Sequence, residues 1–336
     1  MSTSQPTLAA TVTEGWFEAR PSADTAKRLA EAWRSIWRKN ALYALDLASK
    51  GLGEPLSHLQ RAVATVDLER KLEPRLFARL ATLMEAMQRK DIYAAYDTVQ
   101  AWQSDPPDTW ATNQIKTESI AIHAWEQATL TEARETKVDP AASLQLFPLL
   151  EADLESVTGI ASEALDKIGQ VDSAMLAEIK AHVSLIKLFK GRGVEGFSSL
   201  KSFGAIWLQL PQTEKALAWF LEHLVHECSH LHLNALLAID PLLLNPNELH
   251  QAPIRPDPRP LFQVLHGTFV LARNCRVHRK LVSRWPRPDL EASLSQFESQ
   301  FLRGLDVLRT SMKPTPLGQR LLNSLEAELE SQRVRK

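Results

Sequence analysis

Residues 213–239 read TEKALAWFLEHLVHECSHLHLNALLAI. This stretch contains several histidines and glutamates among apolar residues, and its periodicity determines how they are arranged. Its apolar side chains recur at three- and four-residue spacing, which predicts one long α-helix. Thr213 is the expected N-cap, because a threonine hydroxyl accepts a hydrogen bond from a free N–H of the first turn. The apolar positions include Leu221, Leu224, Val225, Leu233, Leu236 and Leu237.

The same stretch contains the motif H-E-x-x-H, with His226, Glu227 and His230. Positions i and i+4 lie on one face of a helix, so both imidazoles can reach a single metal ion. A neutral histidine nitrogen is available near pH 7. The structural alternative is a buried helix with two hydrogen-bonded histidines and a capped Glu227. Burying an unpaired glutamate beside them is costly, which favours the metal site. By spacing, His223 and His232 lie off the ligand face, and we expect them at the surface or behind the ligands.

Spacing alone leaves the third metal ligand open. The metzincin extension of the motif fails, because Leu233 and Leu236 stand where that motif needs glycine and histidine. Glu248 and His250 follow in an expected loop. His266 lies inside an apolar helical stretch, where a polar side chain is unusual. Gly267, the next residue, has no side chain and would let another backbone segment or a ligand come close. We therefore favour His266 as the third ligand over a core histidine bonded to a backbone carbonyl.

A proline-rich loop precedes that stretch and reads IRPDPRP at residues 254–260. Its three prolines keep the backbone extended, so Arg255 and Arg259 are presented on a stiff loop. The planar guanidinium fork suits a carboxylate, which makes both arginines candidates for binding an acidic cofactor or substrate. The alternative is a structural clamp between one of these arginines and Asp257.

The remaining periodicities predict a mainly α protein with a small β element packed beside the motif helix. Residues 203–210 (FGAIWLQL) are aromatic and β-branched and predict a strand. Residues 181–189 fit either a helix or a strand. We divide the chain into a helical N-terminal region, residues 1–170, and a metal-binding catalytic region, residues 171–336. Further helices are expected at residues 26–47, 74–87, 92–102, 117–133, 144–164, 261–282, 290–311 and 317–333.

The composition disfavours several classes of function. The 336 residues include 39 Lys and Arg against 40 Asp and Glu, a net charge of -1 that disfavours a general nucleic-acid binder. Twelve glycines argue against a glycine-rich nucleotide cradle. Two cysteines, Cys228 and Cys275, exclude a disulfide framework and fit a reducing compartment. No stretch has the length of a membrane span and the N-terminus lacks a secretory pattern, so we expect a cytoplasmic protein without a membrane partner.

Several stretches together resemble a known family. They are LVHECSHLHL at residues 224–233, RPDPRPL at 255–261 and LHG at 265–267, and FGAIWL at 203–208 fits the strand before the motif. This set is similar to the HExxH-motif peptide-modification proteins, which are typically encoded in bacterial gene clusters for ribosomally synthesised and post-translationally modified peptides (RiPPs). The resemblance covers about residues 171–284, and the N-terminal half shows no specific match.

The resemblance implies an iron(II)- and 2-oxoglutarate-dependent dioxygenase. Such an enzyme hydroxylates the β-carbon of a residue in a ribosomal precursor peptide and converts 2-oxoglutarate to succinate. Under this resemblance His226, His230 and His266 hold the iron, and Arg255 or Arg259 holds a carboxylate of 2-oxoglutarate.

The expected ligand set departs from the usual one for such enzymes. Non-haem iron oxygenases commonly use two histidines and one carboxylate on one face of the metal, with open positions for the other reactants. Glu227 cannot easily restore that set, because one residue after His226 it points about 100° away around the helix. We therefore expect Glu227 to be a catalytic residue that acts behind the ligands or carries a proton.

Two other classes of function stay open. A zinc metallopeptidase would use Glu227 as the general base on zinc-bound water, with Glu248 or His266 as the third ligand. Against it, the sequence shows neither a clear edge strand that could align a peptide nor a downstream helix with a glutamate at a convincing spacing. A non-enzymatic helical peptide-binding protein would keep only a structural metal site. The N-terminal helical half is expected to shape either a peptide groove or a homodimer contact.

Overall fold

The computed structural model describes residues 14–121, 123–136, 144–211 and 215–333. These residues form eleven α-helices and nine short strands, so the prediction of a mainly α protein with a small β element is confirmed. The chain divides into two units, which are described separately. Unit 1 comprises Met1–Leu29, Lys167–Ala177 and His232–Lys336, and unit 2 comprises Ala30–Asp166 and Glu178–Leu231. The sequence-based division at residue 170 stays a prediction.

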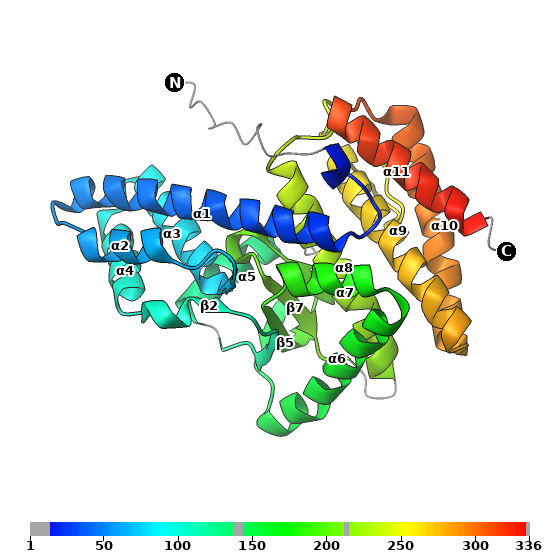
Figure 1. Ribbon diagram of the computed structural model, residues 1–336, viewed down its shortest axis with the longest axis horizontal. Coiled ribbons are helices and arrows are strands. Elements are labelled where there is room, and N and C mark those ends of the chain that lie inside the picture. Colours follow the sequence, from blue (N-terminus) through cyan, green and yellow to red (C-terminus); the bar gives the residue numbers. More distant parts are fainter. Residues whose placement is uncertain (1–13, 122, 137–143, 212–214, 334–336) are drawn as a thin grey trace. The chain divides into compact units, whose positions relative to one another are not determined.

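Figure 1 follows these elements along the chain. The helices are α1 (Ala23–Leu52), α2 (Ser57–Thr65), α3 (Pro74–Arg89), α4 (Ile92–Gln103), α5 (Ala124–Thr136), α6 (Glu151–Val171), α7 (Ser173–His182), α8 (Ala216–Leu237), α9 (Leu261–Arg284), α10 (Pro288–Ser311) and α11 (Pro316–Arg333). The strands are β1 (Lys71–Leu72), β2 (Ala111–Thr112), β3 (Lys116–Ser119), β4 (Gln145–Phe147), β5 (Leu185–Arg192), β6 (Gly196–Ser198), β7 (Ala205–Gln209), β8 (Leu249–Gln251) and β9 (Pro258–Pro260).

Most of the expected helices are present, and local sequence explains their ends. Helices α1, α3, α4, α8, α9, α10 and α11 occupy the stretches where periodicity predicts them. Pro74 is the first residue of α3, where its missing N–H costs no hydrogen bond. Asp91 caps α4, and its carboxylate accepts a hydrogen bond from the backbone N–H of Ala94 at 3.0 Å. The expected cap of α8, Thr213, lies outside the described residues.

Two of the expected helices are wrong in their first turns. In the helix expected at residues 117–133, Lys116–Ser119 instead forms β3, and α5 begins only at Ala124. In the helix expected at 144–164, Gln145–Phe147 forms β4 before α6. Both strands pair with β5, and such long-range backbone hydrogen bonds override a weak helical period. The undecided stretch 181–189 contains the end of α7 and the first half of β5.

Unit 2 contains a five-stranded sheet in the order β3-β5-β7-β6, and β4 pairs with β5. Strands β3, β5 and β7 are parallel, whereas β6 runs antiparallel to β7. Strand β7 confirms the strand expected at residues 203–210. The helix with the HExxH motif, α8, is the next helix after β7 in the chain. A buried apolar cluster joins α5 to this sheet through Ile120, Leu130, Ala133, Leu185, Phe189, Phe197, Ala205 and Trp207.

Unit 1 is built mainly from α9, α10 and α11. Helices α9 and α10 approach closely at Gly304, where a Cβ would lie 2.3 Å from the hydroxyl oxygen of Thr268 on α9. Only glycine permits that spacing without a shift of the helices. The proline-rich stretch 254–260, expected as a loop, ends in β9, which pairs antiparallel with β8. Within the described ranges, no helix is long and apolar enough to cross a membrane.

Candidate metal centre

Helix α8 brings the two histidines of the motif together. The ring centroids of His226 and His230 lie 5.0 Å apart, with the ring planes at 63°. Both side chains are half-buried, whereas the neighbours Leu224, Val225 and Leu231 are fully buried. The two imidazoles therefore form a partly accessible pair in an otherwise apolar helix wall. This is the arrangement that the i, i+4 spacing predicts, and their role as metal ligands stays a prediction.

Glu227 is held by the edge strand β6. Its side chain is 2% exposed, and its Oε2 accepts a hydrogen bond from the hydroxyl of Ser198 at 2.9 Å. At Gly196, two residues earlier on β6, a Cβ would lie 3.0 Å from Oε1 of Glu227. The strand thus offers both a donor and room for the carboxylate. Sequence analysis missed Ser198 and Gly196, because nothing local relates a serine 29 residues away to the motif.

His223 lies one turn before His226 and forms its own polar group. Its ring stacks on Trp219 with centroids 3.9 Å apart, and its Nδ1 is 3.0 Å from the Trp219 carbonyl oxygen. Burial lowers the pKa of His223, but the nearby Glu195 and Glu222 carboxylates outweigh burial, so the pKa lies above its usual value. His223 was expected at the surface or behind the ligands. It is buried, with its ring centroid 6.1 Å from that of His226.

The other predicted ligand, His266, lies on α9 in unit 1. It is half-buried, and its ring meets Phe262 edge-on with centroids 6.4 Å apart. A Cβ at Gly267 would lie 3.2 Å from the side chain of Pro253, so this glycine accommodates the proline-rich stretch. His266 and the motif belong to different units, and the ligand role of His266 therefore stays a prediction.

The two predicted arginines of unit 1 differ in their surroundings. Arg259 lies on β9 and pairs with Asp257, with 2.7 Å between Nη2 and Oδ2. This ion pair is the structural clamp between an arginine of the loop and Asp257 that the sequence analysis gives as the alternative to carboxylate binding. Arg255 is exposed. Glu248, the alternative ligand of a peptidase site, pairs with Lys313 at 3.1 Å. The exposed Arg255 is therefore the more available of the two arginines for a carboxylate.

A second pair of potential ligands lies in unit 2, on α7. A carboxylate oxygen of Glu178 and a ring nitrogen of His182 lie within 4.8 Å of each other, and both side chains are buried. Sequence analysis missed this pair. The two residues are four positions apart, and this spacing places them on one helix face only because residues 173–182 form a helix. His232, expected like His223 at the surface or behind the ligands, is buried, and its ring stacks on Phe269 at 6.1 Å.

No protein-family model matches the chain, and no curated protein matches its sequence.

Proposed function

We propose that this protein is an iron(II)- and 2-oxoglutarate-dependent hydroxylase acting on the β-carbon of a residue in a ribosomally synthesised peptide. The observation that carries the proposal is the division of roles on α8. The rings of His226 and His230 are adjacent and partly accessible, while Glu227 is buried and bonded to Ser198. The resemblance of the motif stretches to the peptide-modification family supplies the choice of reaction. The cytoplasm, where such peptides are made, is the proposed location.

The proposed roles follow from the chemistry of each side chain. His226 and His230 hold the metal through neutral ring nitrogens, and His266 is the proposed third ligand. Bound iron(II) would activate O2, the oxidant, with 2-oxoglutarate as the co-substrate that is oxidised to succinate and CO2, and this chemistry would permit hydroxylation of an unreactive C–H bond. Arg255 or Arg259 would bind a carboxylate of 2-oxoglutarate through the guanidinium fork.

Glu227 has a supporting role in this proposal. A general base must reach a water molecule on the open side of the metal. The carboxylate of Glu227 is instead 2% exposed and accepts a hydrogen bond from β6. A carboxylate in this position orients the neighbouring histidine side chains or holds a proton, as groups behind metal ligands commonly do.

A zinc metallopeptidase is the second candidate, and one observation favours it. Strand β6 lies at one end of the sheet, antiparallel to β7, and its Ser198 contacts the motif glutamate. An extended peptide can add to such an edge strand through backbone hydrogen bonds. Strand β6 therefore meets one of the two sequence objections to a peptidase, the lack of an edge strand.

The test of the proposed function is the mass of the precursor peptide encoded beside the gene, incubated with the purified protein. We expect a gain of one oxygen atom that requires iron(II), O2 and 2-oxoglutarate together, with succinate formed in equal amount. Shorter fragments that require zinc would instead establish the peptidase. An unchanged peptide, together with a protein that retains no metal after purification, would contradict both enzymes and leave a peptide-binding protein.

Ser198→Ala tests the proposed support of Glu227. Loss of a partner behind the metal ligands typically costs 10- to 100-fold, and we expect kcat to fall by about 10-fold with KM for the peptide little changed. Ser198→Thr, which keeps the hydroxyl, should recover most of the rate. Ser229→Ala is the matched control, since Ser229 is buried on α8 but donates to the Val225 carbonyl oxygen. Equal losses in the two alanine variants would show a purely structural role.

A further inference from the structure

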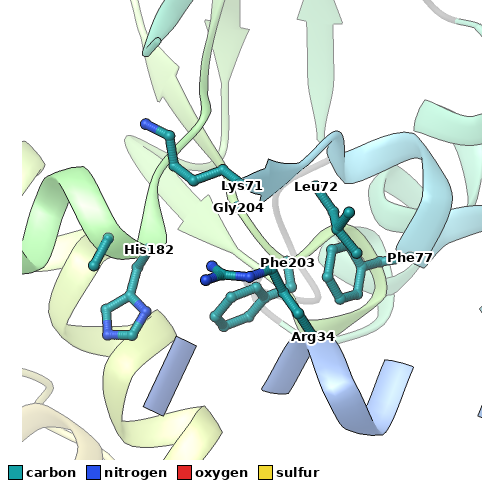
Figure 2. Close-up of a pocket in the computed structure, with 8 residues that line it drawn as sticks. Arg34, Lys71, Leu72, Phe77, His182, Phe203 and Gly204 are labelled. Atoms are coloured by element: carbon teal, nitrogen blue, oxygen red, sulfur yellow. The ribbon is translucent and has the colours of Figure 1, made fainter. Parts of the chain in front are cut away.

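Unit 2 has a small cavity whose lining includes none of the motif residues (Figure 2). Arg34, Lys71, His182 and Phe203 are among the side chains that line it. Its empty volume is about 200 Å³, space open to solvent included, and it has room for about one water molecule. The Nζ of Lys71 is occupied, because it donates to the carbonyl oxygen of Val183 at 2.9 Å. The cavity is too small for 2-oxoglutarate and does not compete with α8 as the place of reaction.

Three aromatic rings follow one another along α8. Trp219, His223 and His226 are spaced by four and three residues, so they lie on one side of the helix. Helical side chains lean toward the N-terminus of their helix, and each ring therefore leans onto the one before it. The centroids of Trp219 and His223 are 3.9 Å apart with the ring planes at 13°, and those of His223 and His226 are 6.1 Å apart at 22°. The rings form a nearly parallel column that ends at a proposed metal ligand.

The first two rings of this column are fixed in place. Trp219 meets Phe220 edge-on, with centroids 5.3 Å apart and the ring planes at 87°, and Phe220 is fully buried. The Nδ1 of His223 donates to the carbonyl oxygen of Trp219 at 3.0 Å, which sets the rotation of the His223 ring. Its Nε2 makes a longer contact, 3.9 Å, with the exposed carboxylate of Glu195. His223 is 7% exposed, so its close-packed surroundings leave little room for another rotamer.

The third ring, His226, is the one whose orientation matters for a metal. It is half-buried, and its ring plane stands at 63° to that of His230, with centroids 5.0 Å apart. A metal ligand must be kept in one orientation, and groups behind the ligands commonly provide this. His223 is the ring that backs His226 on the N-terminal side of the pair. A fixed ring at that place restricts the rotation of the half-buried one.

We propose that His223 is a positioning residue for His226. Stacked between Trp219 and His226, it holds the His226 imidazole in the orientation that binds the metal, and it acts on the metal only through that ligand. The inference rests on the proposed metal centre and deepens it. It gives a part in metal affinity to a histidine that stands outside the H-E-x-x-H motif.

The test is titration of the full chain with Co(II). This ion binds the same imidazole ligands as iron(II) and zinc, and its visible absorption reports how those ligands are arranged. We expect His223→Ala to raise the Kd for Co(II) by about 10- to 100-fold and to change the absorption bands of the bound ion. His223→Phe, which keeps an aromatic ring in the column, should recover most of the affinity and the wild-type bands.

Two further variants separate positioning from stability. Leu221→Ala is the matched control, because Leu221 is 1% exposed on α8 but lies about 200° around the helix from His223. It should lower Tm and leave the Kd for Co(II) unchanged. Trp219→Leu frees the His223 ring and should raise the Kd. Because the rings act as one column, the double variant Trp219→Leu with His223→Ala should bind Co(II) no more weakly than His223→Ala alone.

The outcomes distinguish this inference from the metal centre on which it rests. Wild-type affinity and absorption in His223→Ala would overturn the positioning role and leave the metal centre intact. So would a rise in Kd of the same size in His223→Phe or in Leu221→Ala. A wild-type protein that binds no Co(II) would overturn the metal centre, and this inference with it. If His223→Ala does not fold, His223→Gln takes its place, with the same expected rise in Kd.

Discussion

His226→Ala is expected to lose the bound metal and to lower peptide turnover by more than about 100-fold. The side chain is one of two partly accessible imidazoles whose ring centroids lie 5.0 Å apart on α8. Even partners behind metal ligands typically contribute 10- to 100-fold to affinity or activity, so removal of a ligand should exceed that range. Metal content by mass spectrometry and single-turnover rates measure the two effects separately.

The fold of the variant should be unaffected, because the side chain is half-buried and alanine favours a helix. His58→Ala is the matched control, since His58 is an exposed histidine on a different helix, α2. A variant of His226 that keeps a full equivalent of metal and normal turnover would contradict the proposed centre.

The motif pair could be predicted from sequence because its geometry is local. Two histidines four residues apart share a helix face wherever the helix forms, and the helical period over residues 213–239 is strong. The support from β6 could not be predicted, since the hydrogen bond between Ser198 and Glu227 joins residues that only the sheet brings together. Whether His266 completes the ligand set depends on tertiary structure in the same way.

In the fold, too, elements with a strong local pattern could be predicted, whereas elements that depend on pairing with distant residues could not. Long amphipathic stretches such as α9 and α10 are predicted within a few residues of their ends. Strands β3 and β4 are missed because they are short and exist through pairing with β5. Glu178 and His182 are four residues apart on α7. The sequence did not predict them as a pair, because the stretch 181–189, which includes His182, fits a helix or a strand equally well.

Asp172→Asn is expected to lower the free energy of unfolding by about 3 kcal/mol, which corresponds to a fall in Tm of about 4 °C for a chain of 336 residues. The side chain is 2% exposed, and Oδ2 lies 2.6 Å from Nζ of Lys280 and 2.8 Å from Nε of Arg276. Its Oδ1 also accepts a hydrogen bond from the backbone N–H of Met175 at the start of α7. Asparagine removes the charge and leaves two cations facing a neutral amide.

The pH dependence gives this prediction a definite sign. Burial raises the pKa of Asp172, but the hydrogen bond from Lys280 and the charges of Arg276 and Lys280 outweigh burial, so the pKa lies below its usual value. A carboxyl with a lowered pKa in the folded state stabilises the protein above the pKa of the unfolded chain, and this stabilisation is lost as the pH falls through the folded-state value. The gap between wild type and variant should therefore be constant from about pH 5 to 7 and shrink below pH 4.

Asp289→Asn is the matched control for that measurement. Asp289 also pairs with an arginine near the start of a helix, at 2.7 Å from Arg287, but its side chain is 31% exposed. An exposed pair of this kind contributes about 0–1 kcal/mol, because water and salt screen it. Denaturant titrations from pH 3 to 7 should thus separate the two aspartates. A loss below 1 kcal/mol at Asp172, or a gap that does not change with pH, would mean that Arg276 and Lys280 find other partners, and that the buried carboxylate does not anchor α7 to α9.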